Sequence, residues 1–170
     1  FSDYVRSVLY IGSGTGFLGI GIGRHNPAVE TLYLADWLLT PLVMGKVNWQ
    51  INQHQKTHLS CYPRLGLDFE WADEVEVPEA DVLVCNPPYL PALKQYPEIE
   101  LDHTVGGTDL LETVIKEGSE YADQVYVHFS SIAEREAFSA AESAGEELEQ
   151  VGESSRVPFR VKPALEHPEY

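Results

Sequence analysis

The sequence has little cysteine, little lysine and no long apolar run. Its 170 residues include only two cysteines, Cys61 and Cys85, which disfavours a disulfide scaffold and makes a reduced, cytoplasmic protein the expectation. No apolar run reaches the roughly 18 residues of a membrane-spanning helix, and no signal peptide is visible. We therefore expect no membrane partner. The six histidines show no metal-ligand spacing, so we expect no metal site.

Basic residues are also scarce: 11 Lys and Arg face 27 Asp and Glu, a net charge of -16. Residues 1–60 carry a net charge of +1, so the acidity lies in residues 61–170, whose net charge is -17. Such a surface repels a phosphate backbone, which disfavours nucleic acid as a partner. Adaptation to high salt would produce the same balance. At 44% hydrophobic residues, the chain is too apolar for a disordered acidic polymer.

Apolar runs alternate with helical patterns along a length that suits one domain, residues 1–170. Two short runs, Glu147–Gly152 and Arg156–Val161, flank a polar turn and predict a C-terminal hairpin. The pattern predicts an open α/β sheet, mostly parallel and closed by an antiparallel pair, with its ligand beyond the carboxyl ends of the strands. The expected strands are 7–11, 31–35, one within 58–67, 80–85 and 124–129; the expected helices are 17–24, 38–53, 108–121 and 132–144, the last ending at Gly145.

A glycine-rich loop, Gly12-Ser13-Gly14-Thr15-Gly16, joins the first strand to the first helix. Glycines there permit positive φ angles and close approach of a ligand to the backbone. The spacing of Gly14, Gly16 and Gly19 fits a dinucleotide-binding loop, whereas that of Gly12, Gly14 and Gly16 fits a nucleoside methyl donor. A tight turn without a ligand is the structural alternative. Asp36, at the end of the second strand, can accept hydrogen bonds from ribose hydroxyls or cap the next helix.

The most specific motif is Asn86-Pro87-Pro88-Tyr89, directly after the fourth strand. Two prolines fix the backbone and remove two N–H donors, which leaves nearby carbonyls open to a ligand. The Asn86 side-chain oxygen and the Pro87 carbonyl can together accept both hydrogens of a planar NH2 group, and Tyr89 can stack on it. Holding that nitrogen beside a methyl donor would supply much of the rate by proximity. A proline-rich turn is the structural alternative.

Together, the loop from Tyr10 to Gly16, Asp36 and the segment Asp81–Leu90 resemble the class I S-adenosylmethionine-dependent methyltransferases of the Asn-Pro-Pro-Tyr type. The sequence is most similar to the HemK/PrmC-like branch, which methylates protein glutamine, because Pro91 follows the motif and residues 106–109 read Gly-Gly-Thr-Asp. The resemblance implies a Rossmann-like class I methyltransferase fold, a mostly parallel seven-stranded sheet with an antiparallel C-terminal hairpin.

The resemblance also implies a site. Asn86, Pro87 and Tyr89 would hold the target nitrogen, with Asn86 also beside the cofactor. The donor S-adenosylmethionine, which becomes S-adenosylhomocysteine, would contact residues from the loop and from the ends of the second and third strands. These cofactor-binding residues would be Gly12, Ser13, Gly14, Gly16, Asp36, Trp37, Asp68 and Phe69.

We therefore expect an N-methyltransferase whose acceptor is a protein glutamine side-chain amide, for which a translation release factor is the candidate partner. Two alternatives remain: methylation of adenine N6 or another exocyclic amine in RNA or DNA, and a catalytically weak partner subunit. Tyr10 stands where the family usually has an acid, and few residues precede the first strand, which favours the partner subunit. A nicotinamide-dependent oxidoreductase fits the glycines but gives Asn86 no role.

Overall fold

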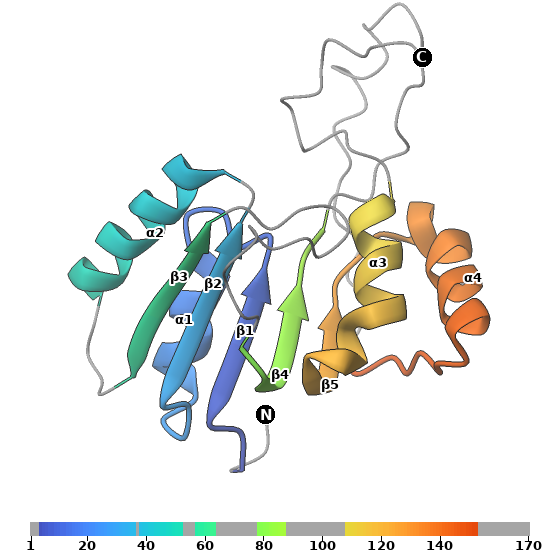
Figure 1. The fold of residues 1–170 in the computed structure, drawn as a ribbon, viewed down its shortest axis with the longest axis horizontal. Coiled ribbons are helices and arrows are strands. Elements are labelled where there is room, and N and C mark those ends of the chain that lie inside the picture. Colours follow the sequence, from blue (N-terminus) through green and yellow to red (C-terminus); the bar gives the residue numbers. More distant parts are fainter. Residues whose placement is uncertain (1–3, 37, 53–56, 64–77, 88–107, 153–170) are drawn as a thin grey trace, which may run out of the picture.

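The computed structural model of the chain describes residues 4–36, 38–52, 57–63, 78–87 and 108–152. In this part of the chain, five parallel strands form one sheet in the order β3-β2-β1-β4-β5 (Figure 1). The strands are β1 (Ser7–Ile11), β2 (Thr31–Asp36), β3 (His58–Pro63), β4 (Ala80–Cys85) and β5 (Ala122–Val127). The helices are α1 (Phe17–His25), α2 (Leu39–Asn52), α3 (Asp109–Glu117) and α4 (Glu134–Ala144), with short 3-10 turns at Gly118–Glu120 and Ser131–Ala133.

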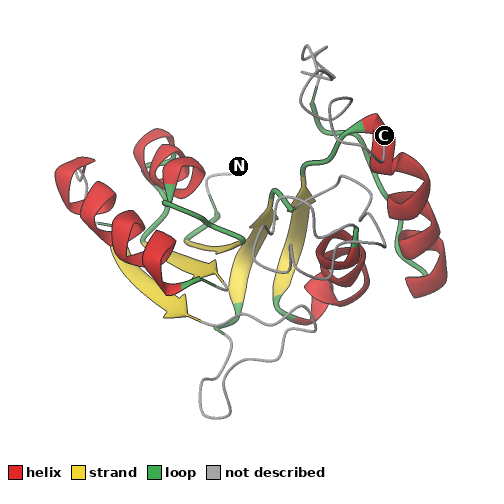
Figure 2. Cartoon of the chain, turned by 90° about the horizontal axis from the view of Figure 1, so that it is seen from above, coloured by secondary structure: helices red, strands yellow, loops and turns green. Residues whose placement is uncertain are grey.

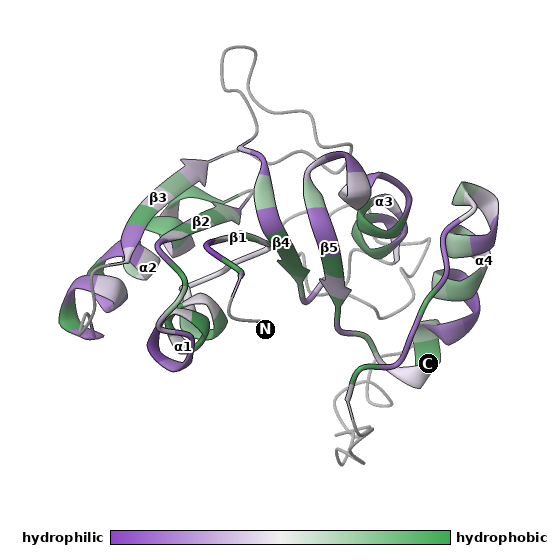
Figure 3. Cartoon of the chain, turned by 90° about the horizontal axis from the view of Figure 1, so that it is seen from below, coloured by the Kyte–Doolittle hydropathy of each residue, from purple (hydrophilic) through white to green (hydrophobic). Residues whose placement is uncertain are grey.

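The strand alternation places different helices on the two faces of the sheet (Figure 2). Val8 and Tyr10 of β1 belong to the core that α1 and α2 cover, whereas Leu9 and Ile11 face the core beneath α3. Helix α4 packs on the outer side of α3 through a row of alanines. Hydrophobic residues are concentrated in the strands and on the inner sides of the helices (Figure 3). This layering is the doubly wound arrangement that the alternating pattern predicts.

Most predicted boundaries are confirmed within two residues, and β1 and β4 match without a shift. Gly145 ends α4 with a φ of 73°, the left-handed conformation that glycine adopts readily. The tail differs from the prediction. Glu147–Gly152 has no regular secondary structure, because Leu148 alone packs on the core while Val151 is 71% exposed. Its expected partner, Arg156–Val161, lies outside the described residues.

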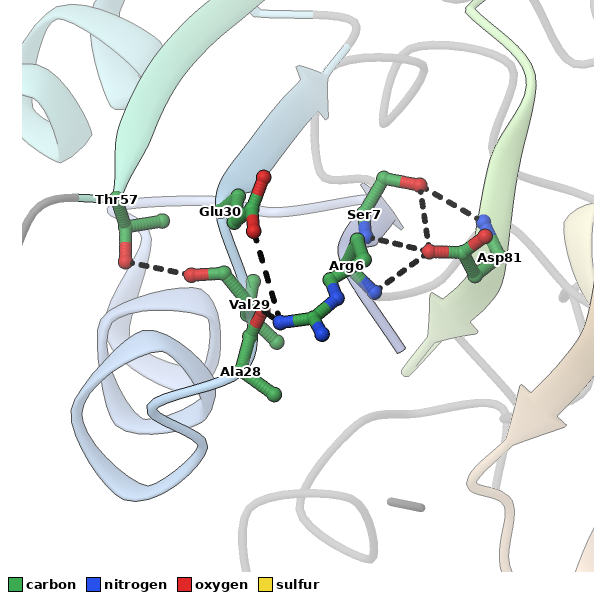
Figure 4. Close-up of polar contacts among 7 residues, drawn as sticks. All are labelled: Arg6, Ser7, Ala28, Val29, Glu30, Thr57 and Asp81. Atoms are coloured by element: carbon green, nitrogen blue, oxygen red, sulfur yellow. Dashed lines mark hydrogen bonds and ion pairs between the residues drawn. The ribbon is translucent and has the colours of Figure 1, made fainter. Parts of the chain in front are cut away.

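At the amino edge of the sheet, the Asp81 carboxylate joins the starts of β4 and β1 by hydrogen bonds (Figure 4). Oδ2 of Asp81 on β4 accepts hydrogen bonds from the backbone N–H groups of Arg6 and Ser7 and from the Ser7 hydroxyl, at 2.6, 2.7 and 3.0 Å. The Ser7 hydroxyl in turn accepts the Asp81 backbone N–H at 2.9 Å. Burial opposes ionisation of Asp81, but these hydrogen bonds and the nearby Arg6 charge outweigh it and lower its pKa. The contacts align the starts of β1 and β4.

Charge is divided between the two faces. Helices α1 and α2 contain no acidic residue, and the outer side of α2 carries apolar side chains such as Val43 and Ile51, 53% and 72% exposed. Helices α3 and α4 both begin with acidic residues, among them Asp109 and Glu134. The expected acidity of the second half therefore lies partly on the α3 and α4 face. Among the helices described, none has both the length and the apolar character needed to cross a membrane.

Candidate functional site at the carboxyl edge of the sheet

Three of the predicted site segments meet where β1, β2 and β4 end. Ile11 is in register with Ala35 on β2 and with Cys85 on β4. Asp36 and Asn86 therefore follow at the level of Gly12, one on each side, with neighbouring strands about 4.8 Å apart. The helix after β1 covers one face and the helix before β5 covers the other, so the order of the sheet reverses here. That is the position at which open α/β sheets hold their ligands.

The glycine loop requires its glycines for two different reasons. Gly12, Gly14 and Gly16 have φ angles of 67°, 53° and 78°, in the left-handed region that side chains with a Cβ rarely adopt. A Cβ on Gly16 would also lie 3.1 Å from Leu34 Cδ1 and 3.3 Å from the Cα of Gly45 on α2, so the loop and α2 cross closely. By contrast, a Cβ on Gly14 would meet nothing within 4 Å among the described residues.

Asp36 fastens this loop. Its Oδ2 accepts the Gly14 backbone N–H at 2.7 Å, and its Oδ1 accepts the Leu38 N–H at 2.9 Å. The second bond forms a local turn just before α2, which begins at Leu39, so it is not the helix cap that the sequence also offered for Asp36. A carboxylate offers about four lone-pair positions, and these two bonds leave two without a partner among the described residues, on a partly exposed side chain. Asp36 can therefore hold the loop and still accept two hydroxyls.

Two observations test whether the loop fits a nucleoside ligand. Ser13 is 4% exposed, and its Oγ has no hydrogen-bond partner among the described residues, although buried hydroxyls are normally paired. Beside it, the space above Gly14 is open in this part of the chain. A polar ligand lying on the loop could satisfy the Ser13 hydroxyl and occupy that space. The residues present therefore fit a ligand with hydroxyl and amino groups.

Tyr10 occupies a core position rather than the ligand-facing one. Its side chain is 5% exposed and lies in the cluster under α1, close to Gly19. Burial raises the pKa of the Tyr10 hydroxyl to about 12, with smaller electrostatic contributions from Cys85 and Asp36. The hydroxyl is therefore neutral at physiological pH. A positively charged group of a ligand would find no carboxylate at this position.

The start of the Asn-Pro-Pro-Tyr motif is held by the neighbouring strand. Asn86 is exposed, and Pro87 after it is buried. Nδ1 of His128, just beyond β5, lies 2.8 Å from Oδ1 of Asn86. The His128 backbone N–H also donates to the Cys85 carbonyl at 2.9 Å. The sequence interpretation gave no role to His128. Its only signal is its position one residue past β5, next to β4, which Asn86 follows directly.

The structure thus brings Gly12, Ser13, Gly14, Gly16, Asp36, Asn86 and Pro87 to one edge. The remaining predicted site residues, Trp37, Asp68, Phe69 and Tyr89, lie outside the described residues. Cys85 is fully buried in the core beneath α3, and this burial raises the pKa of its thiol. In the described ranges, no three metal-ligating side chains come together.

Two solved structures are similar to this fold. The hMettl16 catalytic domain, in complex with the MAT2A 3′UTR hairpin 1, is 11% identical, with a TM-score of 0.60; the match covers 82% of this chain and 56% of that one. The ribosomal protein L11 methylase from Lactobacillus delbrueckii subsp. bulgaricus is 15% identical, with a TM-score of 0.50; the match covers 81% and 59%. No protein-family model and no curated protein matches the sequence.

These likenesses concern the fold. The chain has a Rossmann-like methyltransferase fold, here with a parallel sheet of five described strands. It spans less than two thirds of the length of either similar structure. The HemK/PrmC branch remains a prediction, and the described residues show neither a seven-stranded sheet nor the antiparallel hairpin.

Proposed function

We propose that the chain is an S-adenosylmethionine-dependent N-methyltransferase that acts on a planar NH2 group. The observation that carries this proposal is the shared register of β1, β2 and β4. It sets a glycine loop beside Asp36 on one side and Asn86 on the other, at the switch point of a methyltransferase fold. An oxidoreductase would use the loop and Asp36 but not Asn86, so the methyltransferase accounts for more of the site.

The donor would lie on the glycine loop. Asp36 has two lone-pair positions left for the ribose hydroxyls, and Ser13 Oγ and the space above Gly14 would meet the rest of the ligand. When bound, S-adenosylmethionine supplies a methyl group on a positively charged sulfur, and S-adenosylhomocysteine is its product. Because Tyr10 is neutral, it offers no ion pair to a positively charged group of the donor.

The acceptor nitrogen would be held by Asn86 and Pro87 at the end of β4. With the donor bound beside it, the nitrogen lone pair would displace the sulfur from the methyl carbon, and the sulfur would keep the electron pair of the broken bond. The nitrogen then loses one proton to solvent, so a strong general base is not needed. The side chains need only accept the N–H hydrogens and aim the nitrogen, which is catalysis by positioning.

The favoured acceptor is a protein glutamine amide, with a translation release factor as the candidate partner. The net charge of -17 in residues 61–170, part of it on α3 and α4, would repel bare nucleic acid. RNA is the second candidate, because the similar hMettl16 domain is bound to an RNA hairpin. The L11 methylase is named for a ribosomal protein, so similar folds are associated with both protein and RNA. A catalytically weak partner subunit is the third candidate function.

The test is methyl transfer from labelled donor to a release factor, to RNA and to DNA, each at low and moderate salt. We expect label in the protein acceptor. Label in nucleic acid alone would overturn the protein preference but keep the methyltransferase. In Asn86→Ala, transfer should fall by orders of magnitude while S-adenosylhomocysteine still binds, because only acceptor alignment is lost. Unchanged turnover in that variant would refute the role of Asn86.

A further inference from the structure

Asn86 and His128 are held side by side by the backbone of the sheet. The β4–β5 ladder pairs Cys85 with Val127, and the His128 N–H bond to the Cys85 carbonyl extends it one residue past both strands. Residues at the same level of a parallel pair project to the same face. The 2.8 Å contact between His128 Nδ1 and Asn86 Oδ1 is therefore set by register rather than by a chance meeting of two surface side chains.

This contact has a definite polarity. A side-chain amide oxygen only accepts hydrogen bonds, so the 2.8 Å contact requires the proton of His128 to reside on Nδ1. The amide oxygen has a second lone pair. With the first engaged by His128, the second remains for an N–H of the acceptor. If the amide were turned over, its NH2 would face His128, and Nδ1 would have to be unprotonated.

We infer that His128 is a positioning residue: its Nδ1–H fixes the Asn86 amide so that the oxygen, not the NH2, is presented to the acceptor nitrogen. The catalytic role of His128 rests on the proposed function, whereas its contact with Asn86 does not. A free asparagine amide can rotate by a half-turn between two states that differ little in shape. A donor fixed on the neighbouring strand selects the state that can accept an N–H.

The tautomer of His128 tests the geometry without any assay of activity. Long-range proton–nitrogen spectra of protein carrying ¹⁵N-histidine distinguish the Nδ1–H form from the Nε2–H form, and loss of one signal set in His128→Asn assigns it among the six histidines. We expect the Nδ1–H form in the wild-type chain, at a pH where the ring is neutral. In Asn86→Ala, the Nε2–H form should gain population. An Nε2–H wild-type ring, or an unchanged tautomer in Asn86→Ala, overturns the inference.

Measurements of methyl transfer then test whether the contact between His128 and Asn86 contributes to catalysis. His128→Ala removes the donor, whereas the Nδ2 of His128→Asn can occupy the place of Nδ1. One hydrogen bond is worth about 1 kcal/mol, so His128→Ala should lower kcat about twofold to fivefold, with little change in the affinity for S-adenosylhomocysteine. His128→Asn should recover most of that loss. His25→Ala, at the exposed end of α1, is the matched control and should behave as wild type.

The outcomes separate the two claims. Wild-type kcat in His128→Ala, or loss of S-adenosylhomocysteine binding along with kcat, overturns the positioning role. If no acceptor is methylated by any form of the protein, the proposed function fails, while the tautomer result still decides whether His128 orients the Asn86 amide.

Discussion

The clearest energetic prediction concerns two glycines of the same loop, replaced one at a time by alanine. Gly14 and Gly16 both have positive φ angles, 53° and 78°. A left-handed alanine costs about 1–2 kcal/mol, and the loss of glycine flexibility in the unfolded chain returns about 0.4–1 kcal/mol. Gly14→Ala meets no described neighbour and should therefore lose about 1 kcal/mol of unfolding free energy.

Gly16→Ala carries an additional steric cost. Its Cβ would lie 3.1 Å from Leu34 Cδ1 and 3.3 Å from the backbone Cα of Gly45, which cannot rotate away. Overpacking of this kind adds about 1–3 kcal/mol, so the total loss should be about 2–4 kcal/mol. Urea denaturation measures both losses, provided that the unfolding free energy of both variants depends equally on urea concentration. Equal losses in the two variants, or a larger loss in Gly14→Ala, would refute the close crossing of the loop and α2.

The same two variants distinguish an effect on ligand binding from an effect on stability. Under the proposed function, the methyl of Gly14→Ala enters the space that the donor occupies. We therefore expect Gly14→Ala to weaken S-adenosylhomocysteine binding at least tenfold although it folds better than Gly16→Ala. Titration calorimetry measures this affinity. Wild-type affinity in Gly14→Ala would place the ligand elsewhere.

Two further predictions concern parts of the fold that position the site. Because the folded-state pKa of Asp81 is lowered, its stabilisation should be present above its unfolded pKa of about 3.9 and be lost as pH falls through the lower folded value. Asp81→Asn should thus lose about 1 kcal/mol at pH 7 and flatten that acid decline in urea titrations; parallel pH profiles for Asp81→Asn and wild type would contradict this. Gly19→Ala should destabilise the chain, since its Cβ would lie 2.8 Å from Leu34 Cδ2, whereas Gly21→Ala, with open space around it, should gain up to about 1 kcal/mol from helix propensity. Thermal unfolding ranks the two, and the reverse order would contradict the packing of α1.

The sequence predicted the strands best where they are buried on both sides. Ser7–Ile11 and Ala80–Cys85 are mostly apolar, and they end just before Gly12 and just before Asn86-Pro87, so their limits could be found without the fold. β5 begins two residues earlier than predicted, because Ala122 joins the ladder opposite Ala80 although the exposed Asp123 and Gln124 interrupt the apolar pattern. Pairing with a neighbouring strand, not hydrophobicity, decides where that strand starts.

The site was predictable in its motifs but not in its contacts. Gly12, Asp36 and Asn86 follow predicted strands, so parallel topology alone brings them to one edge. The bond between His128 and Asn86 joins residues 42 positions apart, and it depends on the register of β4 with β5. Gly45 was missed for a similar reason: a single glycine within a helix indicates close packing only when the partner, here Gly16, is known.

The most direct test of the central claim is calorimetric titration of the wild-type chain with S-adenosylhomocysteine, beside an identical titration with NADH. The methyltransferase site predicts saturable binding of S-adenosylhomocysteine, weakened in Asp36→Asn, and no binding of NADH. No detectable binding of S-adenosylhomocysteine at millimolar concentration would contradict the enzyme and favour the partner subunit. Binding of NADH alone would favour the oxidoreductase.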